Sequence, residues 1–243
     1  MLQARTGLVI ATALALGGCS TAQFGVEMAV HPKRYTLRKT EPATLRLPQD
    51  QRFAIALESD QREPGLDGNA DASADARDTG EGVATATVER SGSGEGLFRL
   101  GQGFSNDTDR QMDLDVVVRY QYEFAARTEP DAGTPDATVG LRLYAHEEHG
   151  RMQRDLVLVD YSTEDGATQQ QGDKTLTLTL TLGPGQTMDV FLAGRATVDV
   201  TAQRSASATL KLTDLEFEVA TRPAPAVQAT SAPSRPGDGQ GPE

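Results

Sequence analysis

The residues with the most distinctive chemical pattern form an acidic run between positions 67 and 78. Its side-chain oxygens fall at every second position and an Asp closes the run at its twelfth residue, as in the calcium-binding loop of an EF-hand. Ala72 stands where that loop needs a Gly, however, and no amphipathic helix pattern flanks the run. We therefore expect a solvated acidic spacer without a metal, with calcium binding as the alternative. The candidate calcium ligands are Asp67, Asn69, Asp71, Asp75 and Asp78.

The other patterns that could support catalysis are incomplete. His146 and His149 are three residues apart, whereas the helical zinc motif needs a spacing of four. Ser93 lies between two glycines but not in the strand–turn–helix pattern of a nucleophile elbow. The Gly-Gln-Gly at residues 101–103 lacks the third Gly and the Lys of phosphate-binding loops. The sequence therefore predicts a protein that is not an enzyme and binds no cofactor.

Two groups of side chains could contact a ligand. Thr177 and Thr179 belong to a row of Thr residues that alternates with Leu between residues 175 and 182, and such a row could meet a glycan or another ordered surface. Thr is also a good strand former, so the row has a purely structural explanation. Tyr144 and Tyr161, on neighbouring predicted strands, could form an aromatic contact for a sugar or a protein. The absence of Trp weakens the case for sugar.

The charge balance limits the partners. The chain has 35 Asp and Glu against 23 Lys and Arg, and a formal net charge of −12. Nucleic-acid binding needs clustered cations, so this balance disfavours nucleic acid. It also disfavours an anionic lipid surface as the main partner.

The N-terminus has the pattern of an export signal. Residues 7–16 are apolar but too short to span a bilayer, and Leu16-Gly17-Gly18-Cys19 follows. This segment resembles the lipobox of bacterial lipoproteins. The resemblance implies cleavage after Gly18, acylation of Cys19 and attachment to a membrane through that lipid. In that family an Asp directly after the Cys retains the lipoprotein in the inner membrane. This chain has Ser20 at that position, which implies the outer membrane. The alternative is an ordinary signal peptide with an incidental Cys.

The rest of the chain divides by composition. After a signal peptide at residues 1–18, residues 19–58 contain a tether and a predicted hairpin formed by residues 45–47 and 53–57. Residues 59–82 are acidic and poor in large apolar side chains, which predicts a disordered loop. A Gly- and Ser-rich stretch at 91–96 and a tail at 222–243 are also predicted to be flexible.

Residues 83–221 alternate between apolar and polar side chains over several long stretches, most clearly at 112–127, 175–182 and 206–219. A period of two predicts half-buried strands and an all-β fold, an antiparallel two-sheet β-sandwich of jelly-roll or immunoglobulin type. The change of phase near Thr213 predicts a bulge, and Gly194 predicts a bend or bulge. The uncharged strand at 176–182 is expected in the middle of a sheet, because an exposed edge of this kind promotes aggregation.

The same region loosely resembles the jelly-roll-like modules of secreted bacterial surface proteins. The resemblance lies in the turn at Leu182–Gln186, the Ala- and Thr-rich strand after it and the segment at 205–210. We therefore expect a non-catalytic envelope lipoprotein that faces the periplasm or the cell surface, and whose β-sandwich binds or scaffolds another envelope protein. The alternative is a carbohydrate-binding module for surface polysaccharide.

Overall fold

The computed structural model describes residues 33–38, 43–129, 137–148, 152–163 and 168–224. The chain divides into two units, residues 1–31 and 32–243, and every described residue belongs to the second. The predicted leader, the predicted acylation site at Cys19, His149 and most of the predicted C-terminal tail lie outside the described residues.

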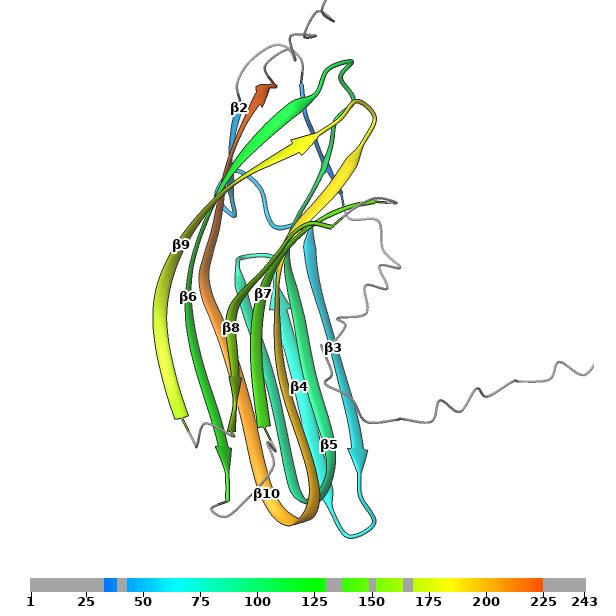
Figure 1. The fold of residues 1–243 in the computed structure, drawn as a ribbon, viewed down its shortest axis with the longest axis vertical. Helices are drawn as coiled ribbons and strands as arrows, with labels where there is room; N and C mark the ends of the chain where they lie inside the picture. Colours follow the sequence, from blue (N-terminus) through cyan, green and yellow to red (C-terminus); the bar gives the residue numbers. More distant parts are fainter. Residues whose placement is uncertain (1–32, 39–42, 130–136, 149–151, 164–167, 225–243) are drawn as a thin grey trace, which may run out of the picture. The chain divides into compact units, whose positions relative to one another are not determined.

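The described chain is all-β, as the sequence predicts, and contains no α-helix (Figure 1). Its ten strands are β1 (Tyr35–Thr36), β2 (Ala43–Leu47), β3 (Ile55–Pro64), β4 (Asn69–Arg77), β5 (Glu81–Ser105), β6 (Met112–Thr128), β7 (Ala137–Glu147), β8 (Met152–Ser162), β9 (Thr168–Leu182) and β10 (Thr187–Pro223).

All ten strands belong to one hydrogen-bonded sheet. Its main path is β1-β5-β10-β6-β9; β3 and β4 also pair with β5, β2 and β7 with β10, and β8 with β7. Every pairing is antiparallel except that of β1 with β5. The two longest strands therefore organise the fold, because each has several neighbours along its length.

Both long strands double back at the same end of the sheet (Figure 1). In β5 the reversal is at Arg90 and Gly92, which have positive φ angles of 72° and 132°. In β10 it is marked by a register shift between Val200 and Arg204. The first part of β5 consequently pairs with β4 and its second part with β3. The sheet curls until it is nearly closed, so the predicted division into two separate sheets is not confirmed.

The prediction of a disordered acidic loop at residues 59–82 is wrong, as is that of a flexible stretch at 91–96. The first contains most of β3, all of β4 and the start of β5, and the second lies within β5. The reason is close backbone packing. A Cβ added to Gly96 would lie 2.4 Å from the carbonyl oxygen of Ser73, and one on Gly94 would contact the Ala72 methyl. Ala and Gly thus form a strand face without large side chains, which composition alone does not reveal.

The predicted N-terminal hairpin is also incorrect. Residues 43–47 pair with residues 217–221 at the end of β10, whereas residues 55–64 pair with the second part of β5. Each strand therefore joins a partner distant in sequence, and a local alternation pattern cannot distinguish that arrangement from a hairpin.

The strand phases predicted for the C-terminal half are largely confirmed. The register of β10 shifts between Thr213 and Glu216, as expected, and the shift keeps Leu212, Leu215 and Phe217 buried. At Gly194 the register is continuous, so the predicted bulge is absent. A Cβ there would lie 2.2 Å from the Phe98 ring, so Gly194 instead makes room for that ring.

The interior is lined by the alternating apolar residues of the long strands. They form one cluster that includes Leu100, Leu114, Val116, Leu141, Leu143, Leu180, Val190, Leu192, Leu210 and Phe217. Burying each such side chain contributes about 1.5–3 kcal/mol, which makes this interior the main source of stability.

Candidate functional site

The acidic run does not form a metal cage. Asn69, Asp71 and Asp75 lie on the extended strand β4, where alternate residues are almost 7 Å apart along the strand. Asp71 pairs with Arg62 at 3.3 Å and Asp75 with Arg77 at 2.9 Å. Asp67 and Asp78 lie beyond the two ends of this strand. In the part of the chain that the structure describes, no three His, Cys, Asp or Glu residues are grouped to hold a metal ion. The alternating oxygens are the outward face of a strand.

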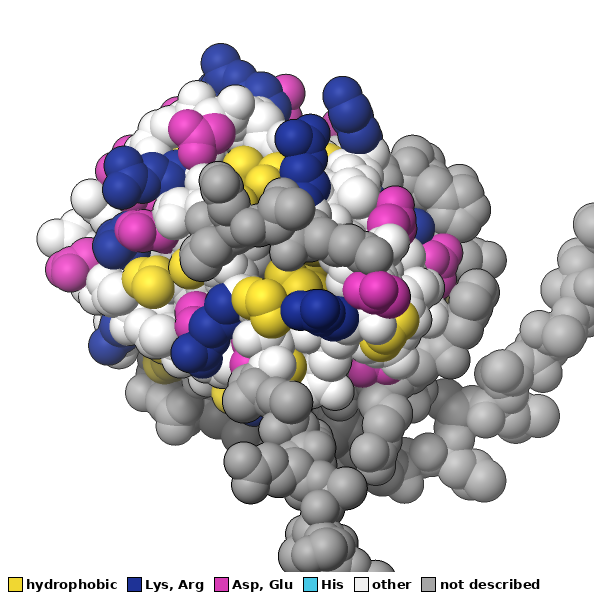
Figure 2. Space-filling model, turned by 90° about the horizontal axis from the view of Figure 1, so that it is seen from above, with side chains coloured by type: hydrophobic (Ala, Val, Ile, Leu, Met, Phe, Trp, Pro, Cys, Tyr) yellow, Lys and Arg dark blue, Asp and Glu magenta, His cyan; other side chains and the backbone are white. Residues whose placement is uncertain are grey.

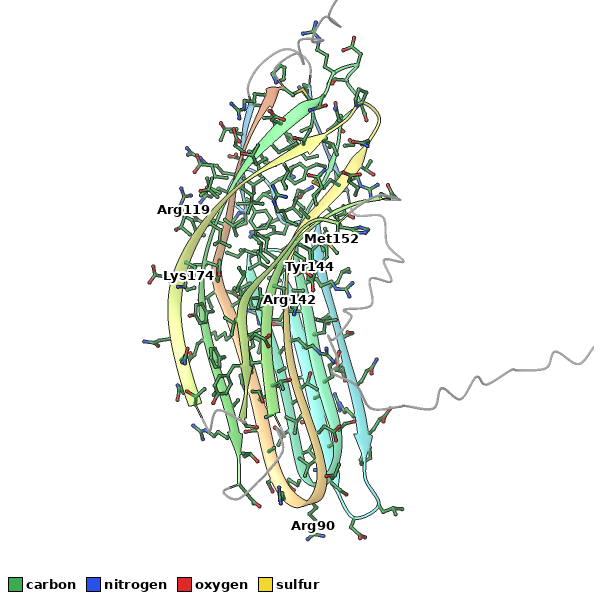
Figure 3. All side chains as sticks on the ribbon, viewed as in Figure 1. Arg90, Arg119, Arg142, Tyr144, Met152 and Lys174 are labelled. Carbon is green, nitrogen blue, oxygen red and sulfur yellow. The ribbon has the colours of Figure 1, made fainter. Side chains whose placement is uncertain are left out.

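The two candidate tyrosines do not form a joint binding surface. Tyr144, which is labelled in Figure 3, is only 5 % exposed. Its ring stacks on that of Phe191, with the ring centroids 5.3 Å apart. Burial raises its pKa. Tyr161 lies opposite Val139, which is buried, and its ring is 5.5 Å from that of Phe124. The two tyrosines therefore point to opposite faces of the sheet, contrary to the expected shared contact.

The region around His146 contains a charged cluster that the sequence did not predict. Asp189, opposite His146 on β10, is 1 % exposed. The Arg34 Nε lies 3.7 Å from its carboxylate, and the Arg34 guanidinium also pairs with Glu148 at 3.0 Å. Burial raises the pKa of Asp189, and Arg34 partly opposes that rise. The cluster ties residues before β1 to β7 and β10.

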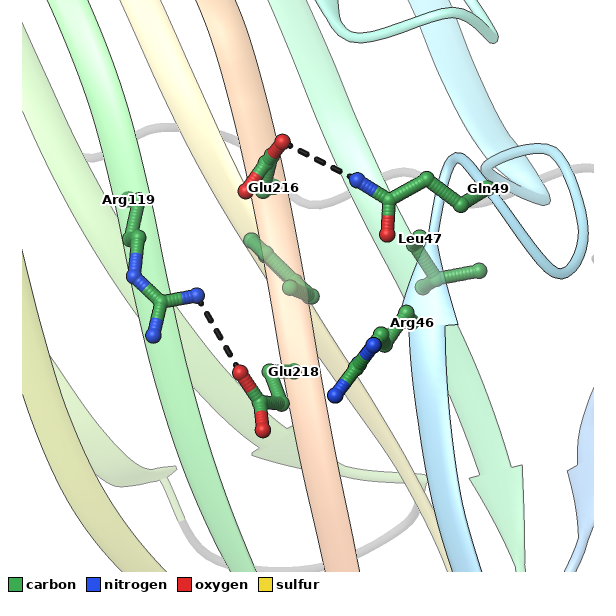
Figure 4. A pocket seen from close by; sticks show the side chains of 7 residues that line it. Arg46, Leu47, Gln49, Arg119, Glu216 and Glu218 are labelled. Carbon is green, nitrogen blue, oxygen red and sulfur yellow. Dashed lines mark hydrogen bonds and ion pairs between the residues drawn. The ribbon is translucent and has the colours of Figure 1, made fainter.

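One small cavity lies on the outer face of β2, β6 and β10 (Figure 4). Its volume is about 180 Å³. Arg119 pairs with Glu218 at 3.2 Å, and the Gln49 amide donates to Glu216 at 3.0 Å. These polar groups already have partners, so the cavity offers little to a ligand.

The strongest candidate site is the free edge of β9. Among the described strands β9 pairs only with β6, and it lies at the end of the main path, along the margin of the sheet (Figure 1). The sequence predicted a central position for residues 176–182, and this prediction is wrong. One side of β9 is paired with β6 and the other side is an edge. An uncharged edge promotes aggregation, but this does not prevent a folded protein from having one.

The direction of the backbone groups of β9 follows from one contact. The Gln153 side chain on β8 donates to the carbonyl oxygen of Thr181 at 2.7 Å and accepts from its N–H at 3.3 Å. The main-chain groups of Thr181 therefore point away from β6. Directions alternate in an antiparallel ladder, and the register of β9 with β6 has no shift. Thr175, Thr177 and Thr179 therefore also present their N–H and C=O groups to the outside.

The Gln153 amide shows that this edge can be occupied, because it bonds to Thr181 as a neighbouring strand would. No described strand continues this pairing to Thr175, Thr177 or Thr179. All three are exposed. The sequence indicated Thr177 and Thr179 for their side chains, whereas in the structure their outward main-chain N–H and C=O groups are the groups that could bind a partner.

The side chains of the row are less available than the sequence suggested. The Thr179 hydroxyl donates to Asp115 at 2.7 Å, and the Thr181 hydroxyl donates to Asp113 at 3.1 Å. These cross-strand bonds fix β9 on β6 and leave its outer edge as the feature that could bind.

No protein-family model matches the chain, and no curated protein is significantly similar to it. None of the described residues forms a helix of the length and apolar character needed to cross a membrane.

Proposed function

We propose that this protein is a non-catalytic lipoprotein of the bacterial outer membrane that binds another envelope protein. In this proposal a strand of the partner pairs with the free edge of β9. The proposed anchor is Cys19, and its support is the lipobox-like sequence of residues 16–19. Incorporation of labelled palmitate tests the anchor: wild type should be labelled, and the Cys19→Ala variant should not.

The observation that carries the binding proposal is the open edge at Thr175, Thr177 and Thr179. An added strand gains affinity from main-chain hydrogen bonds and specificity from its alternate side chains. The segment from Thr175 to Leu182 carries no charge, which removes the usual protection against strand addition. Asp173 and Lys174 immediately before it limit the uncharged part.

Thr177→Pro tests this mode of binding directly. The N–H of Thr177 points outward, so a proline there removes a donor from the free edge without breaking a bond to β6. Co-purification of an envelope protein at a fixed stoichiometry should be lost in Thr177→Pro and kept in Thr177→Val. Equal capture by both variants would contradict strand addition. Amide spectra of both variants check that the fold is intact.

The alternative function is carbohydrate binding by the outer face of β9. It is favoured by the side chains of Thr175 and Thr177, which are exposed. Saturable binding on a glycan array that is lost in a Thr175→Ala/Thr177→Ala variant would support it. Because these substitutions keep the backbone edge, the same variant should retain protein binding under the leading proposal.

We also infer that the curled sheet works as two facing layers of a jelly-roll-like sandwich. The support is the reversal of β5 and β10 and the close approach of Gly96 to Ser73 and Thr85. In this arrangement β8 and β9 are the edges on one side, and the Gln153 amide joins them at one point.

A further inference from the structure

A groove beside β1 and β2 combines several basic side chains. It is lined by Lys33, Arg34, Tyr35, Thr36, Arg38, Ala43 and Gln51, and its volume is about 460 Å³. None of these lining residues is an Asp or Glu. In a chain with a net charge of −12, such a groove is a local exception.

The charges in the groove are not equivalent. Arg34 is held by Glu148 and Asp189, so its charge is largely compensated. Lys33 and Arg38 are exposed and have no ion-pair partner within the described residues. Arg62, Arg77, Arg119, Arg142, Arg195 and Arg222 have carboxylate partners, whereas Arg90 and Lys174, like Lys33 and Arg38, have none within the described residues. Lys33 and Arg38 are therefore exposed cations that no described carboxylate neutralises.

The backbone under these two cations is fixed. The side-chain amide of Gln102, which is fully buried, donates to the carbonyl oxygen of Lys33 at 3.0 Å. The Leu37 N–H donates to the carbonyl oxygen of Ser105 at 2.9 Å. Gln51 on the opposite side is held by Gln102 at 3.3 Å. The groove is thus a preformed feature of the fold.

The position of the groove in the chain suggests its ligand. Residues 32–52 contain six Lys and Arg but only two Asp and Glu. Lys33 follows the proposed acylation site at Cys19 by 14 residues. A chain of that length spans at most about 50 Å, which keeps the groove within reach of the membrane surface. Figure 2 shows the molecule from the end of the sheet where β2 lies. On this face Lys and Arg side chains are interspersed with Asp and Glu around hydrophobic side chains.

We propose that this groove binds the phosphate of an anionic lipid headgroup through Lys33 and Arg38. The inference rests on the proposed lipid anchor and adds a second membrane contact to it. Each basic residue close to an anionic membrane surface adds about 1 kcal/mol to the attachment. The acidic net charge argues against a general attraction to anionic lipid, so the contact depends on these two cations.

Flotation with vesicles tests the proposal in a chain whose Cys19 is changed to Ser, so that no acyl chain contributes. A Lys33→Gln/Arg38→Gln variant should bind phosphatidylglycerol vesicles about 30-fold more weakly, since each basic residue contributes about 1 kcal/mol near such a surface. Vesicles of phosphatidylcholine should bind both chains equally weakly. The unchanged leader is present in both chains, so the difference reports the groove.

The matched control is Arg90→Gln/Lys174→Gln, which removes two cations elsewhere. Arg90 lies where the long strands turn back, and Lys174 lies on β9 (Figure 3). This control should bind as the Cys19→Ser chain does. An equal loss in control and groove variant would show a net-charge effect and overturn the proposal.

Inorganic phosphate distinguishes the headgroup from a free anion. Phosphate alone should shift the amide resonances of residues 33–38 only at millimolar or higher concentration. Saturation at micromolar phosphate without vesicles would assign the groove to a free anion instead. Neither result depends on palmitate labelling or on binding to β9, so failure here is separable from failure of the proposed function.

Discussion

At the scale of single residues, buried polar side chains connect segments that are far apart in sequence. Gln102 is 0 % exposed and satisfies four main-chain or side-chain groups. It donates to the carbonyls of Lys33 and Gly103 and accepts from the Ala54 N–H and the Gln51 amide. It therefore joins the residues before β1, the residues before β3 and the middle of the sheet.

Gln102→Ala should destabilise the fold by about 2–3 kcal/mol, because it leaves buried main-chain groups without partners. Urea unfolding measures the loss. Gln49→Ala is the control, since it removes only an exposed bond to Glu216 and should cost less than about 0.5 kcal/mol. Similar losses in the two variants would show that Gln102 is not a connecting residue.

Because of Tyr120, the free energy of unfolding should depend on pH in the alkaline range. Burial raises its pKa from 10.0 to about 12. The unfolded chain therefore ionises first, and the stability from neutral Tyr120 is complete below pH 10 and is lost as pH rises toward 12. The loss is about 2–3 kcal/mol. Unfolding measured from pH 9 to 12 should show this fall in the wild type and a smaller one in Tyr120→Phe. Parallel curves would contradict it.

At the scale of elements, β4 and β5 depend on close contact between backbones. A Cβ on Gly96 would lie 2.4 Å from the Ser73 oxygen and 2.8 Å from the Thr85 oxygen, and neither main-chain atom can move aside cheaply. The Ala and Gly residues in these strands are therefore structural requirements.

Gly96→Ala should destabilise the protein by about 2–3 kcal/mol, because the two strands must separate. Gly140 on β7 provides the control, since a Cβ there would meet nothing within 4 Å. Gly140→Ala should be neutral or stabilising by up to about 1 kcal/mol. Thermal unfolding of both variants provides the comparison. If Gly96→Ala were as stable as the wild type, the backbones of these strands would lie further apart than the structure shows.

At the scale of the whole molecule, the sequence predicted what depends on local alternation. The period of two indicated β6, β9 and β10, and the phase change indicated the bulge after Thr213. It did not predict β4, because small residues that pack through their backbones resemble a disordered segment in composition. It also did not place β9 at an edge, since strand order depends on pairings between distant segments. The candidate site was found only in part: Thr177 and Thr179 were selected, but the direction of their main-chain groups required the Gln153 contact.

The central claim is that β9 offers an open edge, and amide hydrogen exchange tests it most directly. The N–H groups of Leu176, Leu178 and Leu180 bond to β6, whereas those of Thr175, Thr177 and Thr179 point outward. The three Thr amides should therefore exchange more than about 100-fold faster than the three Leu amides in the free protein, and should slow when a partner strand binds. Equal protection of all six amides in the free protein would show that the edge is already paired and would contradict the account.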